Sequence, residues 1–200
     1  EDNVAVVIGA MVIAPLLGPN MALALGAALG DVFLMWKATK TTIVGITLAL
    51  ALSITLGLVY PLNLNSHELM ARTDVGLDSV VLAFASGAAA VISLTTGLAS
   101  VLVGVMVAVA LLPPTATLGL MIGAGQTKLA VGSALLLAVN IVSVNLAAKI
   151  VFWVRGVKPR SWLEKQKANQ SMVTYMFIWA ISLIVLLVVI FIRKGFLNIL

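Results

Sequence analysis

The sequence predicts an all-α, polytopic membrane protein of about six spans, built from two inverted repeats that each contain a broken helix. Of its 200 residues, 62% are hydrophobic and 10% are charged, which is too apolar for a soluble domain of this length. Several apolar runs reach the roughly 20 residues that cross the hydrocarbon core of a bilayer. In addition, an apolar run interrupted by proline near the N-terminus returns in the second half of the chain.

The repeated stretch covers residues 9–20 and 104–115. At one constant spacing the two copies share glycine, methionine, leucine and proline positions, among them Gly9 with Gly104 and Pro19 with Pro114. Proline removes a backbone donor and clashes with the preceding turn of a helix, so each copy is expected to be a broken helix. The alternative is a simple kink, in which neighbouring helices satisfy the backbone groups that proline frees.

The first repeat is assigned to residues 1–60. The chain starts at Glu1 without an initiator methionine, so something is expected to be missing upstream of this repeat. Its broken span covers residues 4–30 and is interrupted at residues 15–20. A short polar connection that includes Asp31 and Lys37 leads to a second span over residues 41–60, which Pro61 closes. Residues 61–78 contain no long apolar run and are predicted to form an external loop with a short interfacial helix.

The second repeat is assigned to residues 79–154. Its first span, residues 79–95, is rich in alanine and glycine, which let helix backbones approach closely in lipid. The second broken span, residues 98–124, is split at Pro113-Pro114, and the last span, residues 129–154, carries Asn140 and Asn145. Residues 155–171 are predicted to be a basic cytoplasmic loop, and residues 172–200 an additional C-terminal transmembrane helix.

The loop charges predict the orientation. Lysine and arginine favour the cytoplasmic side of a membrane, so the basic loop is placed inside and the acidic loop of residues 61–78 outside. The two broken spans then cross the bilayer in opposite directions. The repeats are therefore predicted to be inverted.

Inverted repeats with discontinuous helices at matching positions are typical of secondary transporters, whose solute site lies near the midplane. The start of a half-helix exposes N–H groups and partial positive charge that suit an anion, whereas the carbonyl end of the other half suits Na⁺. The candidate substrate or ion-binding residues are Gly18, Pro19, Asn20, Pro113, Pro114 and Thr115.

Asn140, Asn145 and Asp31 are further candidates that would line the site. For the two asparagines, hydrogen bonds between helices are the simpler alternative. For Asp31, the alternative is an interfacial loop charge. No Asp, Glu, Lys or Arg is assigned to the midplane of a predicted span, which argues against proton coupling.

Other classes of function lack a signal. The sequence has no cysteine, no paired-histidine zinc motif, no nucleophile elbow and no P-loop, so we expect no enzyme, cofactor or metal site. The net charge of +5 is assigned to loops and not to a nucleic-acid surface. The expected partners are the lipid bilayer, a small solute or ion and, through the small-residue surfaces, a second copy of the chain.

Four runs resemble a known family: Asp2-Asn3, residues 8–19, Ala85-Ser86-Gly87-Ala88-Ala89 and residues 104–114. They are similar to the uncharacterised hydrophobic protein family of prokaryotes known as domain of unknown function 389, over about residues 1–154. The resemblance implies a multi-pass protein of the prokaryotic inner (plasma) membrane, often with a cytosolic domain and another helix before the Asp-Asn pair. Because this chain starts at that pair, the resemblance implies that the first repeat lacks its first helix. Family members often carry an acid at the position of Gln126, which is equivalent to Asp31. The resemblance implies no substrate.

The function predicted from the sequence is a secondary transporter or channel for a small solute, with an anion preferred over Na⁺ or a neutral solute. The alternative is an accessory or scaffold subunit that packs through its small-residue faces. A polar cavity that reaches Asn20 and Thr115 would favour transport, and tight dry packing at the two breaks would favour the scaffold.

Overall fold

The computed structural model describes the backbone of residues 17–61, 66–96, 100–157 and 162–197, all of it helical or connecting turns. Side-chain packing is described for residues 18–61, 66–96, 110–157 and 172–195. The helices of these parts are α2 (Leu17–Leu29), α3 (Val32–Val59), α4 (His67–Met70), α5 (Leu77–Thr96), α6 (Ser100–Gly123), α7 (Thr127–Val154) and α8 (Trp162–Leu197). The predicted all-α class is confirmed for the described residues.

Four of the described helices are long and apolar enough to cross a membrane: α3, α5, α7 and the stretch Met172–Gly195 of α8. Two shorter apolar stretches, Gly18–Leu29 and Ala110–Gly123, accompany them. Length and composition therefore support a membrane protein, and the predicted number of six spans is not confirmed. Between α3 and α5 the structure has α4, a single short helix capped by the Ser66 side chain.

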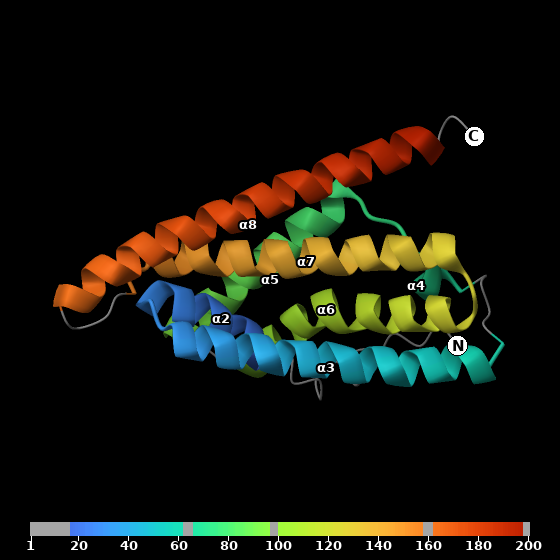
Figure 1. Cartoon of the computed structure of the whole chain (residues 1–200), viewed down its shortest axis with the longest axis horizontal. Coiled ribbons are helices and arrows are strands. Elements are labelled where there is room, and N and C mark those ends of the chain that lie inside the picture. Colours follow the sequence, from blue (N-terminus) through green and yellow to red (C-terminus); the bar gives the residue numbers. More distant parts are fainter. Residues whose placement is uncertain (1–16, 62–65, 97–99, 158–161, 198–200) are drawn as a thin grey trace.

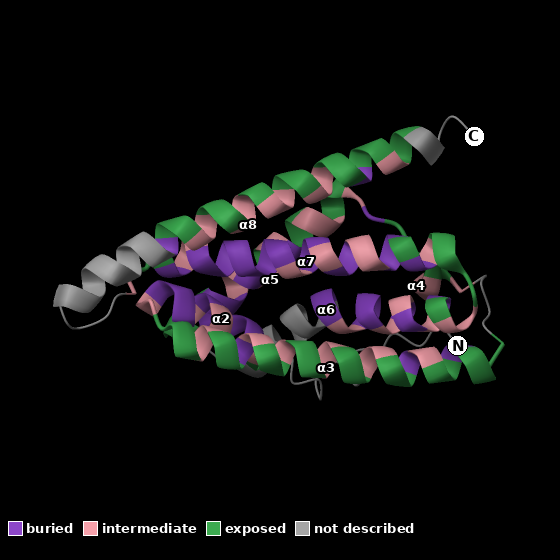
Figure 2. Ribbon diagram, viewed as in Figure 1, coloured by how far each residue is buried: buried purple, intermediate pink, exposed green. Residues whose placement is uncertain are grey.

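Helix α7 is the centre of the bundle. It packs against α2, α5, α6 and α8, while α3 covers α2 and α6 on the far side (Figure 1). Figure 2 shows the consequence: α7 is buried along most of its length, whereas α3 and α8 present exposed faces. The exposed residues of α3 and α8 are largely apolar, as expected for surfaces that meet lipid.

The two repeats have the same turn at matching positions. Gly30 ends α2 and Gly125 follows α6, and both adopt a positive φ of about 70°, which glycine reaches without a steric penalty. In each turn the residue after the glycine donates its N–H to a carbonyl five residues back, at 2.8 Å in Asp31 and in Gln126. This is the Schellman arrangement that ends a helix. The α2–α3 turn and the α6–α7 turn lie at opposite ends of the bundle (Figure 1).

The predicted break at Pro113-Pro114 is wrong. Helix α6 runs without interruption from Ser100 to Gly123, with both prolines inside it. Residues 15 and 16 of the corresponding break at residues 15–20 lie outside the described residues, whereas Gly18, Pro19 and Asn20 belong to the first described turn of α2. Proline is tolerated there because the first N–H groups of a helix have no partner within the helix.

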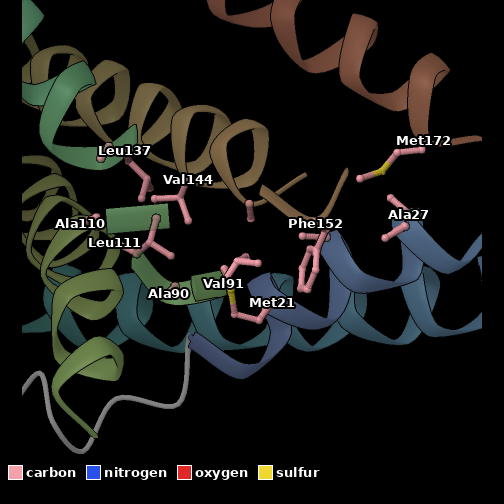
Figure 3. Packing of buried hydrophobic residues seen from close by; sticks show 14 residues of the cluster. Met21, Ala27, Ala90, Val91, Ala110, Leu111, Leu137, Val144, Phe152 and Met172 are labelled. Carbon is pink, nitrogen blue, oxygen red and sulfur yellow. The ribbon is translucent and has the colours of Figure 1, made fainter. Parts of the chain in front are cut away.

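Close helix contacts depend on glycine, as the small-residue composition of residues 79–95 predicted. A Cβ at Gly87 of α5 would collide with the backbone of Val144 in α7, and one at Gly123 of α6 with the backbone of Ile54 in α3. The apolar core fills the space between α2, α5, α6, α7 and α8, with Met21, Val91, Leu111, Val144 and Phe152 among its members (Figure 3).

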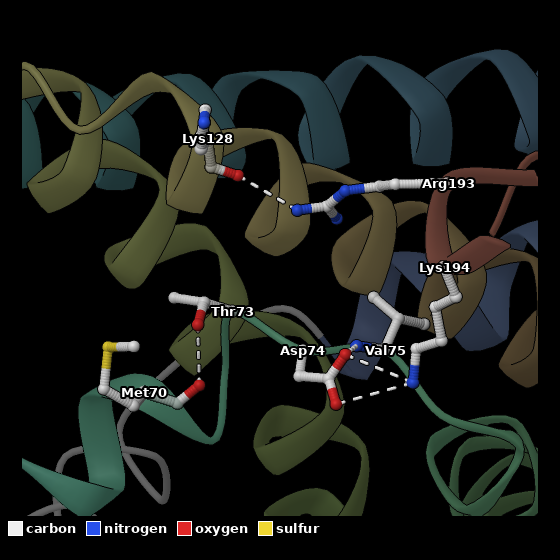
Figure 4. A network of polar contacts seen from close by, with 7 residues as sticks. All are labelled: Met70, Thr73, Asp74, Val75, Lys128, Arg193 and Lys194. Carbon is white, nitrogen blue, oxygen red and sulfur yellow. Dashed lines mark hydrogen bonds and ion pairs between the residues drawn. The ribbon is translucent and has the colours of Figure 1, made fainter. Parts of the chain in front are cut away.

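Helix α8 begins at Trp162, so most of the predicted basic loop of residues 155–171 is helical. At its other end α8 is tied to the bundle by polar contacts (Figure 4). Arg193 Nη2 donates to the carbonyl of Lys128 at 3.0 Å, and Lys194 Nζ lies 3.2 Å from Asp74 Oδ1. Both contacts are exposed to solvent, which limits their contribution to stability.

Candidate functional site

The central helix α7 carries a row of buried polar side chains. Asn140 is 6% exposed, and Ser143, Asn145 and Lys149 are 0% exposed. Polar residues inside an apolar bundle are costly and normally face its interior, where they pair with one another or line a path for solute. These residues are therefore the candidate functional site.

Two of these polar groups, Asn145 and Lys149, form a chain with Asn20 of α2. Asn145 Nδ2 donates to Asn20 Oδ1 at 2.9 Å and to the carbonyl of Ile141 at 3.0 Å. On the other side of the same amide, Lys149 Nζ lies 3.5 Å from Asn145 Oδ1. We call Asn20, Asn145 and Lys149 the lysine cluster. It joins residues that are 125 positions apart in the chain.

The Lys149 amine makes few and long polar contacts for a buried group that can carry a charge. Its contact with Asn145 is longer than the roughly 2.7–2.9 Å of a strong charge-assisted hydrogen bond. Its other neighbour is the ring of Trp179 in α8, whose centroid lies 4.7 Å away. Among the residues that the structure describes, no carboxylate pairs with Lys149. Burying an ammonium is costly unless charge or hydrogen bonds compensate it, so this amine has unused capacity to bind an anion.

Asn140 has a different role from the lysine cluster. Its Nδ2 donates to the carbonyl of Ala110 at 2.7 Å, and this is the carbonyl that Pro114, four residues later, cannot use as an acceptor. The asparagine thus satisfies the backbone carbonyl that Pro114 frees, which helps α6 to continue through this proline. The simpler alternative for Asn140, a hydrogen bond between helices, is confirmed.

The structure separates the predicted site residues. Asn20 is 1% exposed and belongs to the lysine cluster, as does Asn145, while Gly18 is exposed and Pro19 half-buried. Thr115 is 0% exposed, but its hydroxyl donates to the carbonyl of Leu111 at 2.7 Å. It lies in the middle of α6, so the expected half-helix start near Thr115 and the carbonyl end near Leu111 are wrong.

Asp31 is exposed and caps α3 by accepting the Leu34 N–H at 2.9 Å. The structure therefore agrees with an interfacial charge at this position and not with a residue that lines the interior. Its equivalent Gln126 precedes α7 without a side-chain cap.

Sequence reasoning missed Lys149. The residue stands close to the basic segment that begins at Arg155, where a lysine normally reaches the membrane surface with its long side chain. A signal was nevertheless available, because Asn145 and Lys149 are four residues apart and therefore share one helix face. A lysine on the face of a buried asparagine indicates the interior.

Two cavities are relevant to function. The larger, of about 590 Å³, is lined almost entirely by apolar residues of α8 and of the segment before α5, and the lysine cluster does not line it. A smaller one, of about 260 Å³, has a mixed polar and apolar lining and reaches Asn140 from the α4 end of the bundle. The chemistry of their linings makes the smaller cavity the more relevant one for a polar solute.

The apolar helices and the buried polar row define a helical membrane protein. More particularly, the chain belongs to the family described as domain of unknown function (DUF389), which matches residues 11–146, so the resemblance seen in the sequence is confirmed. The chain is also 35% identical over 190 residues to a protein of Methanocaldococcus jannaschii named uncharacterized protein MJ0678. That alignment covers 95% of this chain and 59% of the relative, so the chain spans about three fifths of that protein's length. No solved structure matches the chain.

Proposed function

We propose that the protein is a transporter or channel for a small anionic solute in the prokaryotic plasma membrane, with the lysine cluster as its binding site. The observation that carries the proposal is the Lys149 amine, fully buried in the bundle and without a carboxylate partner among the described residues. An anion of the solute would supply the missing charge.

The hydrogen bonds of the cluster support this assignment. Asn145 donates its two amide hydrogens to Asn20 and to the carbonyl of Ile141, so its amide oxygen faces Lys149. The ammonium has three donors, and Asn145 engages one of them at long distance. The remaining donors can bind the oxygens of a carboxylate, phosphate or other small anion, or a halide.

The repeat supports transport more than a fixed structural role. We propose that the hairpins α2–α3 and α6–α7 are inverted copies, because they share the glycine turn and their turns lie at opposite ends of the bundle. Such repeats allow alternating access through the movement of one half against the other. Neither of the two cavities described above has Asn20 or Thr115 in its lining, which by itself favours the scaffold alternative. Against the scaffold, Gly87, Gly119 and Gly123 already pack against helices of the same chain. A second copy of the chain stays an expected partner, and we expect no enzymatic activity.

The test is anion flux in proteoliposomes that contain the purified full chain. A panel of chloride, nitrate, phosphate, formate and succinate is offered, with sodium and glycerol as the cationic and neutral counterparts. We expect at least one anion to be taken up, and Lys149→Met to abolish this uptake. Lys128→Met is the matched control, because it removes an exposed lysine from the same helix. Uptake of cations or neutral solutes alone would refute the proposal.

A further inference from the structure

A second polar feature lies at the α4 end of the bundle, on another face of α7 from the lysine cluster. It is the cavity of about 260 Å³ whose wall is formed by α5, α6, α7 and the residues that follow α4. We call it the α4-end cavity. Arg72 and the exposed Asp78 belong to its lining, as do the buried residues Ala110, Pro114 and Asn140.

The cavity reaches the middle of the central helix. Asn140 stands halfway along the 28 residues of α7, while Arg72 and Asp78 belong to the connection between α4 and α5 and to the first turn of α5. Arg72 is paired with Glu68 at 2.8 Å, so its charge is already balanced. The cavity thus leads from a charged surface at one end to an uncharged amide at half depth.

Asn140 lines this cavity, and its amide has one committed side and one side without a partner. Its Nδ2 is committed to the carbonyl of Ala110, which requires a donor, so the orientation of the amide follows from the proline in α6. Its Oδ1 is buried and has no hydrogen-bond partner among the described residues, and the same holds for the hydroxyl of Ser143, three residues further along α7. Buried polar atoms are almost always paired with protein or water.

We propose that the α4-end cavity is a hydrated site, in which Asn140 Oδ1 accepts a hydrogen bond from water or from a small hydrogen-bond-donating group. The polar residues of the lining, and the buried acceptor that one of them carries without a partner, fit water or a hydroxyl better than an apolar ligand. The mouth of the cavity is polar, and it contrasts with the larger apolar hollow beside α8, where lipid chains suffice as occupants.

Single cysteines test the hydration directly, because the chain has no cysteine of its own. Ser86→Cys places a thiol in the cavity wall, and Ala83→Cys provides a second position on the same wall. Ala85→Cys is the matched control, since Ala85 is at the same depth of α5 but is exposed on the outside of the bundle and does not line the cavity. Each variant in proteoliposomes is treated with methanethiosulfonate reagents that carry a sulfonate or a trimethylammonium group.

The thiolate is the form that reacts, and a thiol in hydrocarbon does not ionise. We therefore expect cysteine at position 86 or 83 to be labelled about tenfold faster, or more, than cysteine at position 85. Equal rates at all three positions, or labelling of position 85 alone, would overturn the hydrated site. If unlabelled protein shows no anion flux while position 86 is still labelled rapidly, the proposed function fails and the hydrated site stands.

Discussion

Replacing Lys149 by methionine separates a functional lysine from a structural one. Methionine is unbranched and flexible, so it fills a similar volume without charge. If Lys149 is retained for packing, its replacement should lower the free energy of unfolding. If Lys149 is retained for binding a solute, its replacement should abolish anion uptake without lowering the free energy of unfolding. The reason is that burying the lysine without a carboxylate partner costs stability.

The contacts of Lys149 set the magnitude. Its position over the Trp179 ring contributes about 2 kcal/mol when desolvated, and its loss leaves Asn145 Oδ1 without this donor, at a cost of about 1–3 kcal/mol. Against these stands the penalty of desolvating an ammonium, several kcal/mol even after relaxation. We expect the free energy of unfolding of Lys149→Met to be unchanged or raised by up to about 2 kcal/mol, while anion uptake is lost.

The assay is unfolding of the purified variant by SDS in mixed micelles, followed by far-UV circular dichroism, alongside the flux measurement. Lys128→Met serves as the control in both, since Lys128 is exposed and its side chain pairs with no described carboxylate. A loss of about 3–5 kcal/mol, the size expected when one partner of a buried ion pair is removed, would refute the reasoning. Full anion uptake by the variant would refute it as well.

Three further predictions concern packing and surface charge, and the same SDS titration measures them. Asn140→Ala should lower the free energy of unfolding by about 1–3 kcal/mol because it leaves a buried carbonyl unpaired. Pro114→Ala restores an N–H that can donate to the Ala110 carbonyl, so Asn140→Ala should cost less stability when it is combined with Pro114→Ala. Strictly additive effects in this double variant would contradict the assignment of Asn140 to that carbonyl. Gly87→Ala should cost about 1–3 kcal/mol through collision with the facing backbone, whereas Gly195→Ala, with open space around it, should stay within about 0.5 kcal/mol; equal effects would speak against close packing at this contact. Lys194→Ala should cost less than about 1 kcal/mol because its ion pair is exposed, and a loss above about 2 kcal/mol would show that the pair matters more than its exposure implies.

The sequence predicted the features that depend on composition and on local backbone chemistry. An apolar, weakly charged chain can only be helical in a bilayer, since every backbone group must find its partner within the segment. The repeat placed Gly30 and Gly125 at equivalent positions, and both form the same helix-ending turn. The many small side chains in the stretch 79–95 likewise predicted a close helix contact, which the structure has between Gly87 and the backbone of Val144.

The prolines show where local reasoning stopped. Pro113 and Pro114 each remove a backbone N–H donor whatever their surroundings, and the sequence alone is enough to predict this loss. Whether the helix breaks depends on the groups that face the freed carbonyls. Asn140, on another helix, supplies the donor for Ala110, so α6 continues.

The position of Lys149 was likewise decided by tertiary structure. In a bilayer both the lipid and the bundle interior are apolar, so the hydrophobic pattern does not distinguish the inner face of a helix from its outer face. Lys149 is interior because α2 and α8 pack on the same side of α7 and bring Asn20 and Trp179 to it. The sequence by itself determined that these are membrane-spanning helices with particular turns. Only the packing of the helices decided which polar side chains meet, because lipid imposes no preference of its own between apolar faces.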